Sequence, residues 1–388
     1  MSYRALWTAD VHIYNGLPYA KRGADSLITD RLIDTVSVLK EMGRYAQTNG
    51  IEDLWIAGDL FDKRLLDAIT LRAVIRTLHK LLATDAVNRI HMIGGNHDAH
   101  DAAAVYYTLD ALSEMGEDRI RIYDAEERPL PPEEFGGVRF LPVSYKPKMA
   151  TREILEEAAE QKWAKDTFVV GHQTIVGVRS GEWIAPDGIR PQELAPFAGA
   201  ILGHYHDPQD ITDQIFYLGA PLQHTFGDAG SERGFWDISI EGPKIVERTK
   251  VRVTSVPKFH VIPVQATIEG GKLRVDVDDE TGQAAAPQAG DYVWVQVHGT
   301  EDAVKRTEEW TSQYEMLQRE VGVRLVKVTH VVTAAAKSRL KIKKTAGGTI
   351  SIPAAMRGYV EQQNPEGLDR ARVLELGERA LSAAGEKL

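Results

Sequence analysis

The chain has 388 residues, of which 43% are hydrophobic and 26% are charged, and its formal net charge is −10. These proportions are ordinary for a folded globular protein and exclude a wholly disordered chain. Because the chain contains no cysteine, disulfides and thiolate metal sites are excluded, and any metal must be held by carboxylate, imidazole, amide or water.

The first 250 residues alternate short strand-like runs with helical patterns. Early strands are expected at 4–9, 53–57 and 90–93, and apolar residues at helical spacing follow them at 27–47, 66–82 and 102–115. Later strands are expected at 138–141, 167–170, 200–202, 215–218, 235–240 and 245–248. A βαβαβ start followed by a strand-dense half predicts an α/β fold of two stacked sheets with helices outside, a four-layer α/β/β/α sandwich.

The composition changes after residue 250. A loop-like run is followed by a strand, a helix and a strand, at 281–287, 292–297, 301–320 and 324–332. A break at 345–349 precedes helical patterns at 354–363 and 368–384. At roughly 150 residues per domain, we expect a large α/β domain over 1–250, a small α+β domain over 251–340 and a helical segment over 350–388.

The sequence shows no sign of export or membrane insertion. The N-terminus lacks the basic and apolar regions of a signal peptide, and no run approaches the ~18 apolar residues of a membrane span. We therefore expect a cytoplasmic protein that does not bind membranes. The net negative charge argues against a protein that binds nucleic acid by charge alone. Two interpretations of the basic run 337–344 stay open, a solvated segment and a contact to a phosphate backbone.

Five short motifs carry polar side chains, and each follows a predicted strand. They are Asp10-Val11-His12, Gly58-Asp59-Leu60-Phe61-Asp62, Gly95-Asn96-His97-Asp98, Gly171-His172 and Gly203-His204-Tyr205-His206. Each motif alone is a weak signal, since a single histidine at a strand end is usually structural. Because parallel strands present their carboxyl ends at one edge of a sheet, the set is expected to converge. Convergence delivers two carboxylates, four imidazoles and one amide oxygen, from Asp10, His12, Asp59, Asn96, His172, His204 and His206.

This set of side chains predicts a site for two divalent metal ions. Burial of such charges without a cation is costly, and seven ligands exceed one tetrahedral site but suit two ions that share a carboxylate. The mixed nitrogen and oxygen set fits Mn²⁺ well, and Mg²⁺, Fe²⁺ and Zn²⁺ are also compatible. Two ions about 3.5–4 Å apart hold a phosphoryl group and acidify water. His97, beside the candidate ligand Asn96, is then free to stabilise the transition state or protonate the leaving oxygen.

The order and spacing of these motifs resemble the calcineurin-like metallophosphoesterase superfamily. Within it the chain looks like the SbcD nuclease family, the bacterial and phage relatives of the eukaryotic meiotic-recombination nuclease. The segments 217–221, 226–228 and 234–235 resemble the strand and loop that follow the last motif of that family. The resemblance implies one metal on Asp10, His12, Asp59 and His206, a second on Asp59, Asn96, His172 and His204, and a catalytic role for His97.

The resemblance also implies a function and partners. It implies a two-metal DNA nuclease subunit, an exonuclease on duplex ends and an endonuclease on single strands, which acts in DNA repair and recombination with an SbcC-like ATPase. It implies DNA capping by 251–340, ATPase docking by 350–388 and a homodimer built on the helices at 66–82 and 102–115. Asp62 stands where archaeal and eukaryotic members carry a histidine implicated in exonuclease action, and it matches bacterial-type members.

Several secondary candidates and alternatives remain open. Lys63 and Arg64 follow Asp59 closely and are candidates for a contact to substrate phosphate, with a solvated helix start as an equal interpretation. His100 and His224 are interpreted as residues behind the ligands or on the surface. The alternative function is a small-molecule phosphodiesterase of the same superfamily, although such an enzyme would not need the residues beyond 250. A non-enzymatic scaffold is disfavoured because every expected ligand is present.

Overall fold

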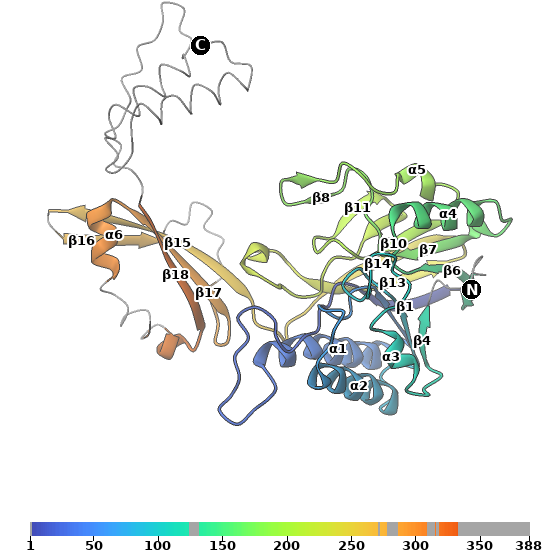
Figure 1. Ribbon diagram of the computed structural model, residues 1–388, viewed down its shortest axis with the longest axis horizontal. Coiled ribbons are helices and arrows are strands. Elements are labelled where there is room, and N and C mark those ends of the chain that lie inside the picture. Colours follow the sequence, from blue (N-terminus) through green and yellow to red (C-terminus); the bar gives the residue numbers. More distant parts are fainter. Residues whose placement is uncertain are drawn as a thin grey trace, which may run out of the picture. The chain divides into compact units, whose positions relative to one another are not determined.

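The computed structural model describes residues 2–123, 132–270, 272–277, 286–308, 315 and 318–332. The chain divides into two compact units. The first comprises residues up to 261 together with 281–294 and 315–327, and the second comprises the other described residues. Figure 1 labels the helices and strands of both units.

The first sheet of the larger unit has the strand order β14-β13-β1-β2-β3-β4. Its strands are β1 (Ser2–Thr8), β2 (Asp53–Ala57), β3 (Arg89–Ile93), β4 (Ile120–Tyr123), β13 (Gly234–Glu241) and β14 (Lys244–Arg252). The first four run parallel to one another. β13 pairs antiparallel with β1, from Ser2 opposite Glu241 to Trp7 opposite Trp236.

The second sheet has the order β11-β12-β10-β7-β6-β5. Its strands are β5 (Glu133–Phe135), β6 (Val138–Val143), β7 (Thr167–Gly171), β10 (Gly199–Leu202), β11 (Gln209–Thr212) and β12 (Ile215–Tyr217). The four central strands are parallel, and the two outer strands pair antiparallel. A separate two-stranded hairpin is formed by β8 (Arg179–Ser180) and β9 (Trp183–Ile184).

The helices of the larger unit connect these strands. They are α1 (Asp30–Asn49), α2 (Ala68–Ala83), α3 (Asp110–Ser113), α4 (Lys148–Ala159) and α5 (Pro191–Leu194), with short 3₁₀ turns η1 (Ala164–Asp166) and η2 (Phe226–Asp228). The Thr29 side chain caps α1 by accepting from the Leu32 N–H, and Asp67 caps α2 in the same way. These caps fix the starts of the two helices that follow the first two motif loops.

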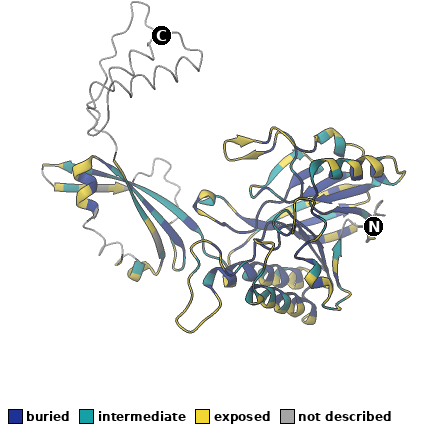
Figure 2. Cartoon of the chain, in the orientation of Figure 1, coloured by how far each residue is buried: buried dark blue, intermediate teal, exposed yellow. Residues whose placement is uncertain are grey.

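Three apolar cores separate four layers. The first core packs Leu39 and its neighbours between α1, α2 and the first sheet. The second lies between the sheets, where Trp7 stacks on Trp55 with ring centroids 4.9 Å apart. The third packs Leu155 and Val169 between the second sheet and α4 and α5. The buried strands and the exposed outer helix faces in Figure 2 follow the same order. This confirms the predicted α/β/β/α sandwich.

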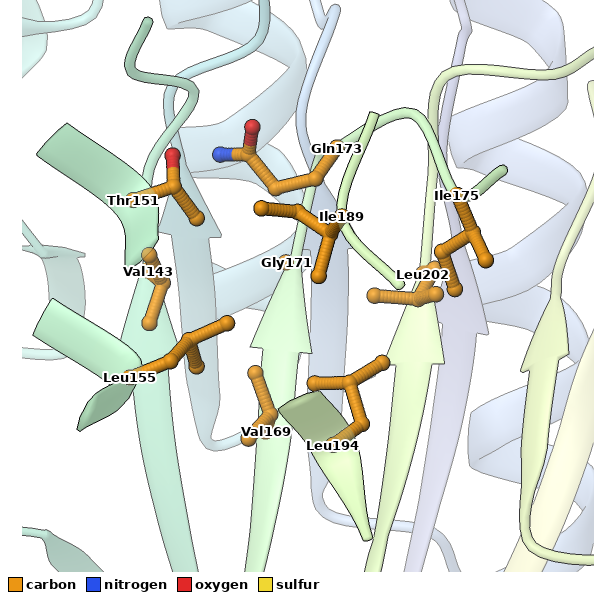
Figure 3. A pocket seen from close by; sticks show the side chains of 10 residues that line it. All are labelled: Val143, Thr151, Leu155, Val169, Gly171, Gln173, Ile175, Ile189, Leu194 and Leu202. Atoms are coloured by element: carbon orange, nitrogen blue, oxygen red, sulfur yellow. The ribbon is translucent and has the colours of Figure 1, made fainter. Parts of the chain in front are cut away.

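The third core contains a small gap beneath α4 and α5 (Figure 3). Its volume is about 10 Å³, and aliphatic side chains line it except at Thr151 and Gln173. A cavity needs about 10–15 Å³ to admit one water molecule. The gap is therefore a packing imperfection and not a ligand site.

A third sheet, of order β16-β15-β17-β18, contributes most of its residues to the smaller unit. The strands are β15 (Phe259–Glu269), β16 (Lys272–Val277), β17 (Tyr292–Gly299) and β18 (Arg324–Val332), and the helix α6 (Glu301–Glu308) follows β17. Val297, Ala303 and Val304 are buried, as the predicted strand–helix–strand pattern requires. The antiparallel β15–β16 pair has no counterpart among the strands expected from the sequence.

The helix expected over 102–115 is wrong, because only Asp110–Ser113 is helical. Ala104 has a φ of +52°, which interrupts a helix, and the Tyr107 N–H donates to the Asp110 side chain at 2.9 Å. The segment thus buries its apolar side chains from a series of turns. In the sequence, these apolar residues have the same spacing as residues on one face of a helix.

Several expectations concern parts of the chain that the structure does not describe. The basic run 337–344, the break at 345–349 and the helices expected within 350–388 lie outside the described residues. The division into three consecutive domains stays a prediction. Among the described residues, no helix combines the length and apolar character needed to cross a bilayer.

Candidate metal centre

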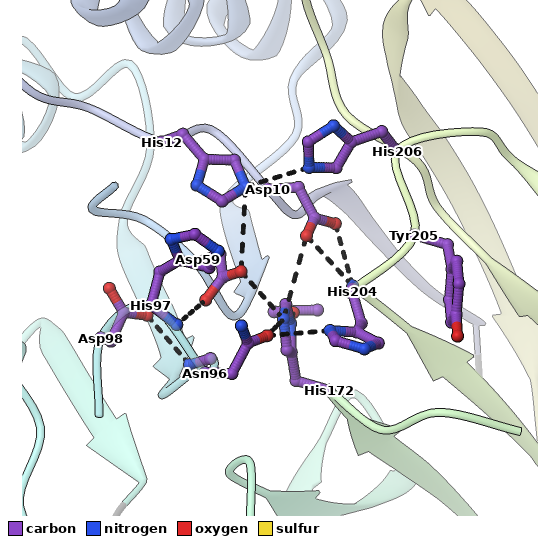
Figure 4. Close-up of polar contacts among 12 residues, drawn as sticks. Asp10, His12, Asp59, Asn96, His97, Asp98, His172, His204, Tyr205 and His206 are labelled. Carbon is purple, nitrogen blue, oxygen red and sulfur yellow. Dashed lines mark hydrogen bonds and ion pairs between the residues drawn. The ribbon is translucent and has the colours of Figure 1, made fainter. Parts of the chain in front are cut away.

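The motif loops leave both sheets at the carboxyl ends of parallel strands, and their side chains meet there (Figure 4). β1 and β2 lead into the loops of Asp10, His12 and Asp59, β3 into the loop of Asn96 and His97, and β7 and β10 into those of His172, His204 and His206. All seven ligand candidates, together with His97, therefore form one cluster. Most of it is buried, with Asp10 and His172 fully enclosed.

Asp59 lies at the middle of this cluster. Its Oδ1 accepts the backbone N–H of His97 at 2.8 Å. Its Oδ2 lies 3.2 Å from Nε2 of His172 and 3.8 Å from Nε2 of His12. One carboxylate thus faces imidazoles on two sides, which is the placement that a bridging ligand requires.

Two groups of candidate metal-ligand atoms lie on either side of Asp59. Asn96 Oδ1 lies 2.8 Å from Nδ1 of His204 and 3.2 Å from Nε2 of His172. On the other side, Nε2 of His12 lies 3.1 Å from Nε2 of His206. The Asp10 carboxylate accepts the His204 N–H at 3.1 and 3.0 Å, and this bond ties the first motif to the last.

The backbone at these positions is strained. Asp10, His12 and Asp59 have φ values of 54°, 50° and 51°, and His204 has 106°. Positive φ is uncommon for residues other than glycine, and such conformations cluster at functional sites. Here they turn consecutive side chains towards one point.

Two glycines permit the close approach of the motif loops. A Cβ at Gly95 would lie 2.6 Å from Cγ of Asp59, and a Cβ at Gly58 would lie 2.6 Å from Cγ of His172. Real Cβ atoms essentially never come under 3.0 Å. The glycine before each of these motifs is thus a steric requirement of the cluster.

The hydrogen bonds of His172 indicate that a positively charged group is needed between the acceptor atoms of the cluster. Its Nδ1 lies 2.8 Å from the Ala57 carbonyl, and because a carbonyl only accepts, this nitrogen carries the proton. When the ring is neutral, the lone pair of Nε2 faces the oxygens of Asp59 and Asn96, which are acceptors as well, so the site needs either a metal ion or a second proton on His172. Facing acceptors need a cation between them. The donor set therefore fits bound divalent metal ions, and a backbone carbonyl behind the ring is the usual arrangement for a metal-bound histidine.

The pKa directions agree with this interpretation. Burial lowers the pKa of His12 and of His204 to about 3, so both rings are neutral and offer lone pairs. Burial raises the pKa of Asp10. Burial also acts to raise the pKa of Asp59, but the charge of His172 outweighs it and the net direction is down. Burial opposes protonation of His172, yet Asp59 and Asp10 raise its pKa to about 9, so that without metal a proton on His172 supplies the cation.

His97 lies at the edge of the cluster. Its Nδ1 donates to the Asp62 carbonyl at 2.9 Å, which fixes the ring, and its centroid lies 4.7 Å from that of His12. One His97 nitrogen lies within 4.8 Å of ligand atoms of His12 and Asp59. This is close enough for the ring to act on a group held by those residues.

His224 belongs to the cluster, a position that sequence reasoning left unresolved. Its Nε2 donates to the Asp10 carbonyl at 3.0 Å, and its ring centroid lies 5.0 Å from those of His12 and His206. Its buried Nδ1 has no hydrogen-bond partner among the described residues. Burial holds the pKa of His224 well below its ordinary value. The sequence left two positions open for this residue, behind the ligands or on the surface, and it lies behind Asp10 and His12.

Asp98 is the second residue whose role the sequence did not show. It is fully buried, and it accepts the N–H groups of Phe61 at 3.0 Å and of Gly95 at 2.9 Å. Burial raises its pKa to about 7. Asp98 thus joins the loops that carry Asp59 and Asn96.

Lys63 and Arg64 lie on the surface after β2. Lys63 Nζ is 3.2 Å from Asp62 Oδ2, and the other oxygen of Asp62 is 3.5 Å from Nδ1 of His12. Arg64 donates to the His100 carbonyl at 3.4 Å. A contact of either residue with substrate phosphate stays a prediction.

Two stacked sheets that deliver buried carboxylates, imidazoles and an amide to a shared edge define a metal-dependent phosphoesterase. Residues 3–208 match the model of the family described as calcineurin-like phosphoesterase. The chain belongs to this family, whose members use divalent metal ions to hydrolyse phosphate esters.

Individual relatives are more distant. The chain is 25% identical over 256 residues to the SbcD component of nuclease SbcCD from Staphylococcus epidermidis, which covers 60% of this chain and 67% of the relative. It is 26% identical over 125 residues to putative phosphoesterase 244L of Invertebrate iridescent virus 6, which covers 32% of this chain and 43% of the relative. Among solved structures, a dimetal phosphatase from Danio rerio has 13% identity and a TM-score of 0.36, and covers 65% of this chain and 99% of that one.

Proposed function

We propose that this chain is a DNA nuclease of the SbcD type, which hydrolyses phosphodiester bonds with two divalent metal ions. The observation that carries the proposal is the alignment with the SbcD component of nuclease SbcCD. It runs over 256 residues and covers 60% of the chain, and so extends past the family match at 3–208. A complete set of buried donors on the matching motifs supports an active enzyme over a scaffold.

In this proposal, the seven candidate residues hold two ions, with Mn²⁺ as the preferred metal. One ion binds Asp10, His12, Asp59 and His206, and the other binds Asp59, Asn96, His172 and His204. The position of Asp59 between two groups of imidazoles supports its role as the shared ligand. When bound, the ions stabilise charge on the phosphate and lower the pKa of water.

His97 is the proposed general acid. The Nδ1–H bond to the Asp62 carbonyl orients the ring and leaves Nε2 to exchange a proton with the leaving oxygen. The backbone N–H of the same residue holds Asp59, so ring and bridging carboxylate are positioned together.

The proposed setting is DNA break repair and recombination with an SbcC-like ATPase. The expected activities are exonuclease action on duplex ends and endonuclease action on single strands, with 251–340 capping DNA and 350–388 docking the ATPase. A homodimer is part of the proposal. Its support is a groove of about 930 Å³ between α1 and α2, where Leu27 and Ile33 are exposed.

The test compares DNA with small diesters in the presence of Mn²⁺. The wild-type protein is expected to degrade linear duplex and single-stranded DNA. Asp59→Asn is expected to lose metal binding and cleavage together, whereas His97→Ala should lose about 10²–10⁴-fold in rate and keep its metal. His79→Ala, exposed on α2, is the matched control.

Two results would contradict this assignment. Turnover of bis-p-nitrophenyl phosphate or cyclic nucleotides without any DNA degradation, even with an SbcC-like ATPase added, would identify a small-molecule phosphodiesterase. Loss of metal from His97→Ala, measured by calorimetric titration, would make His97 a ligand.

A further inference from the structure

A cavity beside the metal centre is bounded by a short exposed hairpin. The cavity has a volume of about 770 Å³, within the ~300–1,000 Å³ of typical ligand sites. His204, Tyr205 and His206 form part of its wall, and the β8–β9 hairpin contributes Arg179 and Trp183. The hairpin extends beyond the second sheet in Figure 1 and is exposed along both strands in Figure 2. The cavity thus connects the metal-binding histidines with an aromatic ring and a cation.

Trp183 is presented by a fixed backbone. Its side chain is 53% exposed, although tryptophan gains more than most residues from burial. The Gln209 side chain of β11 accepts the Arg179 N–H and donates to the Arg179 carbonyl, both at 2.9 Å. Across the hairpin, the Ala185 N–H donates to the Val178 carbonyl at 2.9 Å. An exposed indole on an anchored hairpin offers a flat surface on which a second ring can stack.

The cavity wall carries one cation, Arg179, that faces no acidic partner among the described residues. Its two acidic residues, Asp207 and Asp228, both pair with Arg233 at 2.9 and 2.7 Å, so one of their two negative charges is compensated. The four charges sum to zero, and Arg179 is the cation of this wall that remains available to a phosphate.

We propose that this cavity binds one unpaired nucleotide next to the scissile phosphate of a DNA strand. Trp183 stacks on the base, and Arg179 contacts a phosphate that flanks it. The base is unpaired because a base inside a duplex keeps both faces in its own stack, whereas single-strand binding proteins combine stacking rings with basic grooves. This inference rests on the proposed function, since it assigns a strand of DNA to the same site.

The test measures kcat/KM of the full-length protein with Mn²⁺ on oligothymidylate and on bis-p-nitrophenyl phosphate. Trp183→Ala is expected to lower kcat/KM on oligothymidylate by roughly 5- to 100-fold through a higher KM, and to leave the small diester within twofold. Trp183→Phe should restore most of the loss because it restores a ring. Ile184→Ala, which removes neighbouring exposed apolar surface from the same strand, should behave like the wild type.

Two further measurements separate stacking from a general effect. An oligonucleotide in which abasic positions replace the bases should remove the difference between the wild type and Trp183→Ala. Arg179→Gln should weaken single-strand binding. It should also reduce the slope of log affinity against log salt concentration by about one, as expected for the loss of one phosphate contact.

The outcomes distinguish this inference from the proposed function. A wild-type protein that hydrolyses the small diester but no DNA refutes the nuclease, and the subsite with it. A wild-type protein that cleaves DNA, with Trp183→Ala equally active, refutes the subsite alone. Equal losses on both substrates would also refute it, because Trp183 would then act on the metal centre and not on the base.

Discussion

Substitution of Gly95 by alanine tests whether the motif loops must touch. The added Cβ would lie 2.6 Å from Cγ of Asp59 and closer still to its Oδ1 and its backbone nitrogen, whereas ordinary contacts begin near 3.4 Å, so Asp59 must move by about 1 Å or more. No positive φ applies at Gly95, so the effect is steric and not conformational. Overpacking of this kind costs about 1–3 kcal/mol of unfolding free energy. A displacement near 1 Å in a catalytic group costs about 10²-fold in rate.

The assay pairs urea unfolding of the metal-free protein with Mn²⁺ titration and small-diester turnover. Gly95→Ala is expected to bind Mn²⁺ at least tenfold more weakly, in line with the ~10–100-fold effects of disturbed ligand support, and to lose about 10²-fold in turnover. Gly23→Ala is the control, because its Cβ would meet only Ser26 Cβ at 3.8 Å. If Gly95→Ala kept wild-type metal affinity and turnover, Asp59 would not be the shared ligand in the position described.

Two further predictions concern the histidines. Without metal, stability should fall on both sides of about pH 6.5. Below it, buried His12, His204 and His224 stay neutral while the unfolded chain takes up protons, and these three outweigh Asp10 and Asp98, whose raised pKa values act in the opposite direction. Above it, His172, with a pKa of about 9, keeps a proton that the unfolded chain has released. Urea midpoints in chelator that do not change between about pH 4.5 and 9 would contradict this. Replacement of His224 by phenylalanine removes the donor to the Asp10 carbonyl and should weaken Mn²⁺ binding roughly 10- to 100-fold. The electron paramagnetic resonance signal of free Mn²⁺ measures the affinity. An effect no larger than that of His79→Phe would mean that His224 contributes only through packing.

The parts of the fold that could be predicted from the sequence are those marked by local sequence patterns. The run Leu54–Ala57 is apolar and ends at Gly58, and the strand predicted over 53–57 agrees with the observed β2. The motif residues could be placed together because the carboxyl ends of parallel strands share an edge. That rule needs only strand order, which the βαβ pattern supplies.

The missed features depend on contacts between distant segments. His224 enters the cluster from a segment after β12, where Arg31 of α1 donates to its carbonyl at 3.2 Å. The strands β8 and β9 have two residues each, too few for an alternating pattern to register. The prediction of a helix over 102–115 was wrong for a different reason. The apolar residues do have helical spacing, but a series of turns buries them.

The antiparallel pairing of β1 with β13 joins two strands that are synthesised far apart in time. The strand that leads to Asp10 and His12 is made first, yet one of its neighbours spans Gly234–Glu241. At ~5–20 residues per second, that neighbour is completed roughly 12 to 47 s after β1. During this interval an apolar strand has an unpaired side, which is a template for aggregation. We therefore expect chains that end before β13 to aggregate, so that truncation there yields insoluble protein in place of a smaller enzyme.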